Sequence, residues 1–550
     1  MTVVIARLIG GAGTGKTTEL LSVMDGALER LGGDPLRLGF ASMTRAAREE
    51  AVKRAALKWN IPESRLAIDG WFRTVHSTVY RCLGIAKGQL VADSKADVAW
   101  VSAALGVNLS TTLNDDTGRQ DYLGDPDVSA SLNCWSLARA TLQPMEALVR
   151  KKKQTDDNVP DYAKVIRTVE RYEMAKRLED RVDFTDILLR FAGISYDCVE
   201  GIRDVAPEGE LPAVDAWLFD EQQDASPLLD AVCRRLITAP SVRWCYVVGD
   251  PFQSIYGFAG SSSECFLSWD AAKIRTMPKS YRCPAPILAL GEKCLRRMTS
   301  GYFDRGIAPA DHTGTVSECD GIEELVSGIK PTDEWLLLAR TNYHAGRLYA
   351  AMAEAHKPAR WTSQPEGPTG RSAGLAALLA LERGDAITGS DWGNAIQLLP
   401  QKNDKKLAML VRGFKARWAR EDGATEWDVI FPNELDKVGA TAELVESIAS
   451  GAWCGLVDGG ASWRRMAKKW GPELAGTPRV RIGTIHSVKG AEADNVGLLT
   501  TTSKRVEAGA QDEQQHNEEC RIAYVAVTRA RKNLVIVNEG HAGVPRMEIL

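Results

Sequence analysis

Residues 10–18, GGAGTGKTT, have the types and spacing of a loop that holds the phosphates of a nucleoside triphosphate. The apolar run 3–9 before them predicts a buried strand, and a helical pattern follows them. In such a loop the backbone amides and the helix N-terminus cradle the phosphates, Lys16 reaches the outer ones, and the Thr17 hydroxyl can bind Mg²⁺. A chance glycine-rich turn is the alternative, but the strand–loop–helix order favours a phosphate site. The predicted nucleotide-binding residues of this loop are Gly10, Gly11, Ala12, Gly13, Thr14, Gly15, Lys16, Thr17 and Thr18.

Two further segments carry polar residues at the predicted ends of strands. Apolar residues 213–219 lead into Asp220, expected to bind Mg²⁺, and Glu221, expected to orient or deprotonate the attacking water. Alone, such a pair is commonly a solvated turn, and the phosphate loop favours the functional interpretation. The second segment, VVGDPFQSIYGFAGSS, sets Gln253, Tyr256 and Phe258 in a loop. Its two aromatic residues belong either to the core or to the mouth of a site.

The bulk properties describe a soluble globular chain. With 550 residues it is long enough for about two to four domains. Its net charge of −4 gives no global sign of nucleic-acid binding, but a local basic groove is compatible with it. Eleven cysteines without a C-x-x-C pair argue against a zinc site and for a reducing compartment. No apolar run reaches about 18 residues, so we expect no membrane span and a cytoplasmic location.

The elements that must position these residues form an α/β pattern with two insertions. Lys16 and Asp220 are too far apart in sequence for one compact nucleotide fold, which predicts an inserted block. That block has a helical stripe of Val165, Val169, Tyr172 and Leu178, and a charged break at 150–158 that is either a solvated loop or faces DNA. The predicted segments are 1–83 and 183–275 for a first lobe, 84–182 for its helical insertion, 276–372 and 476–550 for a second lobe, and 373–475 for its helical insertion.

A second, mostly parallel sheet is predicted from apolar stretches at 334–340, 479–487, 495–502 and 534–538. No second phosphate loop accompanies it. We interpret the tryptophans of the second insertion as core residues, namely Trp392, Trp418, Trp427, Trp453, Trp463 and Trp470. Arg282 and Arg529 lie in polar clusters at strand ends or turns, where two lobes could close on one triphosphate.

In this order the segments resemble those of superfamily 1 DNA helicases of the UvrD/Rep/PcrA type. The resemblance extends from Gly10 to Arg531 and is weak in the two insertions. The matching segments are 10–18 (motif I), 42–47 (Ia), 73–79 (Ib), 183–188, 219–224 (II), 249–260 (III), 280–284 (IV), 339–342, 484–492 (V) and 518–530 (VI).

The resemblance implies two RecA-like P-loop lobes, each carrying a helical insertion. It also implies an ATPase that moves 3′ to 5′ on single-stranded DNA, unwinds duplex at single-strand/double-strand junctions, and serves DNA repair or replication. The residues expected to act in catalysis are Lys16, Glu221, Gln253 at the γ-phosphate, and Arg282 and Arg529 as a clamp. Beyond the phosphate loop, Tyr281 would stack on adenine and Glu492 would reach the ribose, while Thr17 and Asp220 would hold Mg²⁺. The expected DNA-binding residues are Thr74, His76, Tyr256, Phe258 and His486.

Departures from the family pattern leave alternatives open. Motif I begins at residue 10, so we expect the upstream glutamine motif that reads adenine in the family to be missing or replaced. Motif III ends in Phe258-Ala259-Gly260 where an arginine is usual, and the second insertion is short. A translocase that strips proteins from DNA with little unwinding is therefore an alternative. A small-molecule P-loop kinase leaves Gln253 and both arginines without roles, and a non-hydrolysing DNA-binding scaffold is opposed by the intact Lys16 and Glu221.

Overall fold

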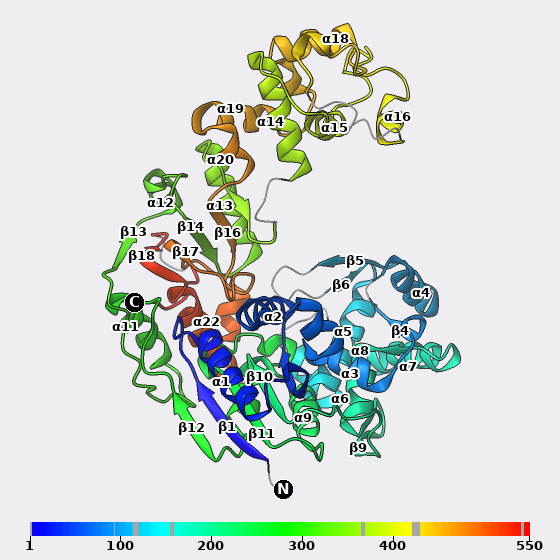
Figure 1. The fold of residues 1–550 in the computed structure, drawn as a ribbon, viewed down its shortest axis with the longest axis vertical. Helices are drawn as coiled ribbons and strands as arrows, with labels where there is room; N and C mark the ends of the chain where they lie inside the picture. Colours follow the sequence, from blue (N-terminus) through cyan, green and yellow to red (C-terminus); the bar gives the residue numbers. More distant parts are fainter. Residues whose placement is uncertain are drawn as a thin grey trace. The chain divides into compact units, whose positions relative to one another are not determined.

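The computed structural model describes residues 3–92, 94–113, 120–154, 159–364, 369–420, 429–540 and 544–549 (Figure 1). The chain divides into two compact units. Unit 1 comprises residues 1–315, 503–531 and 547–550, and unit 2 comprises residues 316–502 and 532–546. The segment 276–315, which precedes the first strand of the second sheet, and the segment 503–531, which follows another of its strands, thus cluster with unit 1.

A six-stranded sheet forms the centre of unit 1. Its order is β12 (Lys273–Thr276), β1 (Val4–Ile9), β11 (Trp244–Gly249), β10 (Ala216–Asp220), β2 (Leu38–Ser42) and β3 (Trp71–Thr74). Each neighbouring pair is parallel. The strands predicted at 3–9 and 213–219 are confirmed as β1 and β10. Because all strands run the same way, the residues that follow β1, β10 and β11 emerge at one edge of the sheet.

Two apolar cores cover the faces of this sheet. Trp217 and Phe219 of β10 pack on one face with α3 (Val75–Leu83), α8 (Phe184–Ala192) and α9 (Pro227–Leu236). Leu218, which points the other way, packs with α1 (Lys16–Arg30) and α2 (Arg45–Trp59). Successive side chains of a strand point to opposite faces of the sheet, and both faces are covered here, so β10 is buried along its whole length.

Helices dominate the block between residues 84 and 182: α4 (Lys95–Leu105), α5 (Pro126–Thr141), α6 (Met145–Lys153) and α7 (Tyr162–Leu178). They share a core that includes Val165, Val169 and Tyr172, as the predicted stripe requires. Leu178 was wrongly placed in that stripe, because it ends α7 and is 78% exposed. The charged break was also misplaced: residues 150–153 form the last turn of α6, where basic side chains complement the helix dipole. Residues 155–158 lie outside the described part of the chain. The small hairpin of β5 (Ser110–Leu113) and β6 (Gln120–Leu123) was not predicted.

The second six-stranded sheet has the order β13 (Thr315–Cys319), β18 (Ala530–Val537), β17 (Ala493–Leu499), β14 (Trp335–Ala339), β16 (Val480–Thr484) and β15 (Arg360–Trp361). Strand β14 pairs in parallel with β16 and β17, and β15 pairs in parallel with β16. A core of unit 2 joins this sheet to α12 (Ile322–Gly328) and α13 (Asn342–Glu354). All four predicted strands are confirmed, and so is the α/β class with two mostly parallel sheets.

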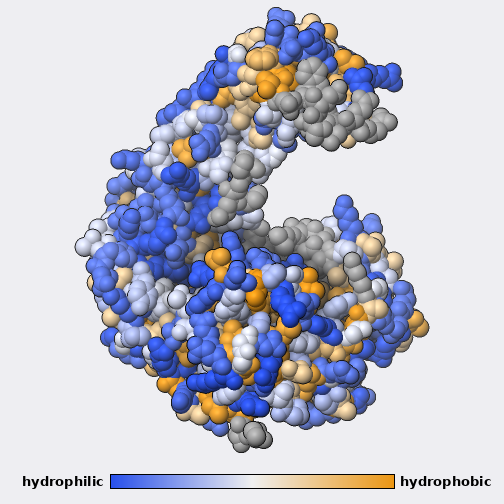
Figure 2. Space-filling view, in the orientation of Figure 1, coloured by the Kyte–Doolittle hydropathy of each residue, from blue (hydrophilic) through white to orange (hydrophobic). Residues whose placement is uncertain are grey.

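A separate helical core fills the block between residues 373 and 475. Its helices are α14 (Gly370–Arg383), α15 (Gly389–Leu398), α16 (Phe414–Arg420), α18 (Ala442–Ala449), α19 (Gly460–Trp470) and α20 (Pro472–Gly476). Trp392, Trp418, Trp453 and Trp463 are buried in it, as expected of core tryptophans. Trp470 is half-buried and donates to the His356 carbonyl, and Trp427 lies outside the described residues. Some apolar side chains of this block also reach the surface, among them Val429 and Phe431, and orange patches mark its exposed face in Figure 2.

Candidate nucleoside triphosphate site

The glycine-rich loop joins the end of β1 to the start of α1. The Gly10 N–H donates to the Gly249 carbonyl at 2.9 Å, so the loop begins beside the end of β11. Gly15 caps α1 in the left-handed region with φ 80°. Lys16 Nζ lies 3.4 Å from the Gly11 carbonyl oxygen, folded over the loop. The first residues of α1, Lys16 and Thr17, therefore stand where free helix N–H groups favour an anion.

Two glycines of the loop allow side chains to approach its backbone. A Cβ on Gly10 would lie 2.4 Å from Lys16 Cγ, so a larger residue would displace the lysine. Gly13, with φ 66°, would place a Cβ 2.2 Å from the Cβ of Arg282. The loop thus holds Lys16 on one side and accepts Arg282 on another. Thr14 turns its hydroxyl inward, donating to the Gly11 carbonyl at 3.1 Å, and offers only its backbone to a ligand.

The carboxylates Asp220 and Glu221 follow β10 directly. Asp220 is 5% exposed and accepts from the Glu221 N–H at 2.9 Å. Burial, followed by the neighbouring charge of Glu221, raises the pKa of Asp220 to about 7, although the charge of Lys16 opposes this. Glu221 adopts the left-handed conformation at φ 53°, and its carboxylate accepts from Gln223 Nε2. The carboxylate of Asp220, which is buried, and the hydroxyl of Thr17, in the first turn of α1, are hard oxygen donors of the kind that Mg²⁺ prefers, so these residue types fit the ion.

Gln253 lies at the same sheet edge, in a short 3₁₀ turn (Pro251–Gln253) after β11. It is 6% exposed, and its Nε2 donates to Asp250 Oδ2 at 2.9 Å. The Asp250 N–H donates to Gln223 Oε1 at 3.0 Å. Gln223 therefore touches both Glu221 and the segment of Gln253, which links the ends of β10 and β11 through side chains.

Arg282, Tyr281 and Arg529 also belong to unit 1. The Tyr281 N–H donates to the Gly13 carbonyl at 2.8 Å, and its 70% exposed ring lies beside Gly15. Arg282 Nη1 lies 3.5 Å from the Thr528 carbonyl oxygen, next to Arg529. Arg529 follows α22 (Glu513–Val527), is 1% exposed, and donates from Nε to the Val525 carbonyl at 3.0 Å. The structure thus brings both predicted arginines to the region of the phosphate loop.

The residues expected along DNA have varied settings. Thr74 caps α3 by accepting from the Ser77 N–H at 3.3 Å, and the His76 ring meets the Phe184 ring edge-to-face. Phe258 is 47% exposed and Tyr256 is half-buried beside it, with ring centroids 6.1 Å apart. Phe258 is therefore not a core residue. His486 is buried and belongs to unit 2. Glu492 also belongs to unit 2 and lies in the loop between β16 and β17, where its carbonyl accepts a hydrogen bond from the Arg481 side chain.

Several residues of this region were missed by the sequence analysis. Three of them, Gln223, Asp250 and Tyr524, lie inside segments that resemble helicase motifs, so their positions in the sequence could have identified them. Arg305 lies in a segment of unit 1 without regular structure or motif, and no pattern announced it. Tyr524 accepts from the Ala12 N–H of the phosphate loop at 3.1 Å, and Arg305 forms an ion pair with Asp250.

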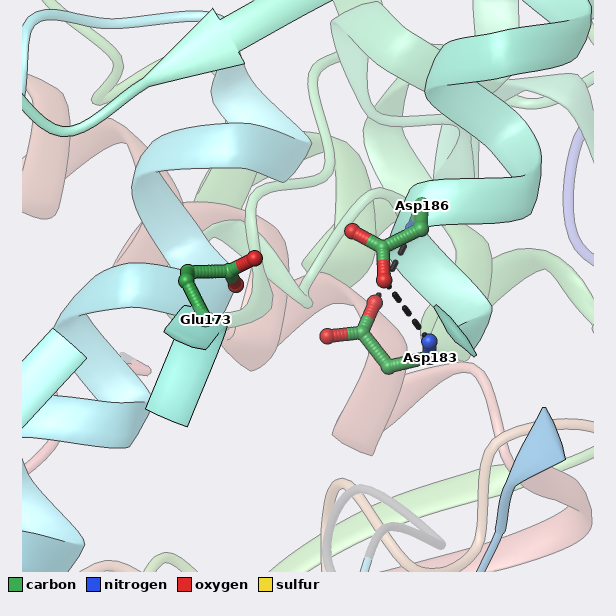
Figure 3. Close-up of side chains that lie close together, drawn as sticks. All are labelled: Glu173, Asp183 and Asp186. Carbon is green, nitrogen blue, oxygen red and sulfur yellow. Dashed lines mark hydrogen bonds between the residues drawn. The ribbon is translucent and has the colours of Figure 1, made fainter. Parts of the chain in front are cut away.

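A buried acidic group elsewhere in unit 1 is an ion-pair cluster. Glu173 of α7 faces Asp183 and Asp186 at the start of α8 (Figure 3). Arg139 lies 2.9 Å from Asp183 and 2.8 Å from Asp186, and Lys176 lies 2.9 Å from Glu173. Burial opposes ionisation of Asp183, but the two cations lower its pKa overall. Because these cations occupy the space between the carboxylates, the cluster joins the first insertion to α8 and is not assigned a metal.

The fold and this site define a class. A parallel sheet whose first strand enters a G-x-x-x-x-G-K-T loop, with an Asp-Glu pair ending another strand, belongs to the P-loop nucleoside triphosphatases. Comparison with family models is more specific. The UvrD/REP helicase N-terminal domain matches residues 4–273, and the UvrD-like helicase C-terminal domain matches residues 468–539. The chain belongs to the UvrD type of superfamily 1 helicases, a family of ATP-hydrolysing DNA helicases.

The two parallel sheets are consistent with the two RecA-like lobes of that family. Membership also implies that the chain binds nucleoside triphosphate and DNA. No curated protein matches the chain. Among the described residues, no helix combines the length and the apolar character that crossing a bilayer requires.

Proposed function

We propose that this helicase moves 3′ to 5′ on single-stranded DNA and separates the strands of a duplex that it meets. The observation that carries the proposal is the loop after β11. Within five residues it runs from Gln253, buried at the edge where the phosphate loop lies, to Phe258, whose ring is half exposed. A change at the phosphate end can therefore move a ring that is able to stack on a base.

In the proposed ATP site, Lys16 and the amides of residues 10–18 bind the phosphates, and Thr17 and Asp220 hold Mg²⁺. The metal ion, when bound, neutralises charge on the phosphate oxygens. Glu221 orients the attacking water and accepts its proton, with Gln223 fixing the carboxylate. Gln253 contacts the γ-phosphate. Each of these groups emerges from a strand or loop at one sheet edge, which supports their joint action.

The two arginines near the phosphate loop are assigned to the transition state. Arg282 and Arg529 neutralise the charge that develops on the transferred phosphoryl group, an effect that acts on the transition state. Tyr281 stacks on adenine, and its high exposure beside Gly15 leaves a ring face for a base. Glu492 completes the site at the ribose. In this proposal Tyr281 carries much of the base contact.

Along DNA, we assign contacts to Thr74, His76, Tyr256, Phe258 and His486. Stacking of a base on an aromatic ring is worth about 1–3 kcal/mol and tolerates any sequence, which suits a motor that grips and releases each base. The predicted lobes, 1–83 with 183–275 and 276–372 with 476–550, are the proposed moving parts, and 84–182 and 373–475 are their insertions.

The experiment that tests this function compares short duplexes with a 3′ or a 5′ single-stranded tail. We expect ATP-dependent strand separation from the 3′ tail and none from the 5′ tail. A blunt duplex is the control for tail-independent opening. Separation from the 5′ tail alone would refute the polarity, and removal of a bound protein from the tail without strand separation would favour the protein-stripping alternative.

A further inference from the structure

Arg305 places a buried guanidinium at the edge of the ATP site. Its side chain is 0% exposed, and it divides its two terminal nitrogens between two carboxylates. Nη1 donates to Asp250 Oδ1 at 2.7 Å and Nη2 donates to Glu292 Oε1 of α11 (Ala285–Leu295) at 2.6 Å. The guanidinium carbon lies 4.6 Å from the ring centroid of Phe252 and 5.1 Å from that of Tyr524.

Arg305 keeps its charge in this setting. Burial would lower its pKa, but the charge of Asp250 is the strongest of the effects that raise it, and the pKa rises overall. A buried ion pair commonly contributes little more to stability than apolar residues of the same volume, whereas loss of one partner leaves a costly charge. The contribution of this ion pair to stability therefore does not explain why a guanidinium lies here. The position of its partner, Asp250, explains it.

Asp250 is that partner, and its two oxygens have separate tasks. Oδ1 accepts from Arg305 and from the Phe252 N–H at 3.1 Å. Oδ2 accepts from Gln253 Nε2 at 2.9 Å and from the Tyr524 hydroxyl at 3.4 Å. With Oδ1 fixed by the guanidinium, the carboxylate plane is fixed, and Oδ2 faces Gln253. Asp250 has 0% exposure, so no bulk water substitutes for these partners.

The same carboxylate reaches the phosphate loop. The Tyr524 oxygen that donates to Asp250 accepts from the Ala12 N–H of that loop. Arg305 also approaches the loop directly, because its Nη1 lies 3.5 Å from where a Cβ on Gly11 would be. Through Asp250 and Tyr524, the guanidinium of Arg305 is thus connected to Gln253, to the backbone of the phosphate loop and to helix α22, which precedes Arg529.

We propose that Arg305 is a positioning residue for ATP hydrolysis, holding Asp250 so that Gln253 and the Tyr524–Ala12 contact keep their places when the γ-phosphate is bound. The inference rests on the proposed contact of Gln253 with that phosphate. Arg305 acts through Asp250 and does not itself touch the nucleotide. Its loss should therefore slow the chemical step and leave ATP binding nearly as it was.

The test is a double-mutant cycle of Arg305→Lys and Gln253→Ala in the full chain, read by DNA-stimulated ATP turnover. Lysine keeps the charge but lacks the planar fork that bridges two carboxylates. We expect kcat to fall about tenfold to a hundredfold in Arg305→Lys, as for a displaced reacting geometry, with KM for ATP changed far less. The double variant should be no slower than the slower single variant, because both changes remove the same contact.

Arg139→Lys is the matched control. Arg139 is also buried, with 4% of its side chain exposed, and also bridges two carboxylates, but in the cluster between the first insertion and α8. We expect Arg139→Lys to lower the melting temperature and to leave kcat at the parental value. If Arg305→Lys behaves in the same way, the positioning role is refuted. If Arg305→Lys does not fold, Asp250→Asn replaces it in the cycle, with the same expected losses.

Failure of the Arg305 inference and failure of the proposed Gln253 contact would give different results. A slow Gln253→Ala variant combined with a further, multiplied loss in the double variant would overturn the Arg305 inference and leave the role of Gln253 intact. Parental turnover in Gln253→Ala would refute the proposed γ-phosphate contact, and the inference with it.

Discussion

Replacing Asp220 with Asn should make the protein more stable in the absence of nucleotide and Mg²⁺, by an amount that increases with pH. The pKa of Asp220 is raised to about 7 by burial and by Glu221, whereas an aspartate in the unfolded chain titrates near its ordinary value. Between these two values the folded state retains a proton that the unfolded state has lost. Stability of the parent therefore falls as pH rises through this window, and an uncharged asparagine escapes that loss.

The size of the effect follows from the shift. A change of about three pKa units corresponds to about 4 kcal/mol once the pH exceeds 7, and the part gained between pH 5 and pH 8 is about 3 kcal/mol. The measurement is urea unfolding of both proteins at the two pH values with a chelator present, followed through the transition of unit 1. Addition of Mg²⁺ with ADP should stabilise the parent more than the variant and reduce the difference.

Asp97→Asn serves as the control for this comparison. Asp97 is also buried, but hydrogen bonds from Ser94 and Arg181 outweigh burial and lower its pKa. Its contribution to stability is thus complete above the unfolded pKa and is lost only as the solution becomes more acidic than pH 5. The Asp97→Asn difference should stay constant between pH 5 and pH 8. A constant difference for Asp220→Asn as well would refute the electrostatic account of the metal-binding carboxylate.

Three further substitutions separate the proposed roles. Phe258→Ala should cost about 2 kcal/mol of stability or less, because half of the ring is exposed, and should reduce strand separation per ATP hydrolysed; a large fall in melting temperature would contradict this. Arg529→Ala should lower turnover on the order of a thousandfold with ATP affinity nearly kept, and weakened affinity at normal turnover would argue against its role. Tyr281→Ala should raise KM for ATP with little change in kcat, and an unchanged KM in ATPase assays would remove Tyr281 from the adenine site.

The parts of this protein that were predictable are those in which local pattern and chemistry coincide. The phosphate loop required a strand before it and a helix after it, and β1 and α1 are both observed. The ends of β10 and β11 were predictable because parallel strands deliver their following residues to one edge. Four tryptophans of the second insertion, Trp392, Trp418, Trp453 and Trp463, were correctly assigned to a core because large apolar rings are seldom left in water.

What could not be predicted depends on contacts between distant segments. Arg305 meets Asp250 across 55 residues and has no periodic neighbours of its own. The carboxylates of the Glu173–Asp183–Asp186 cluster look like separate surface charges until α5 brings Arg139 between them. Leu178 satisfied the helical spacing but came after the last turn that the core covers, which spacing alone does not reveal.

The central claim is that ATP hydrolysis at the phosphate loop drives work on DNA, and Glu221→Gln tests it most directly. Glutamine keeps the shape of the side chain and removes the carboxylate that handles water. The measurement is ATP turnover with and without single-stranded DNA, beside direct binding of ATP, for the parent and the variant. We expect DNA-stimulated turnover in the parent, and near-parental ATP binding with at least about a hundredfold slower turnover in the variant. Turnover of the variant at a tenth of the parental rate would contradict it.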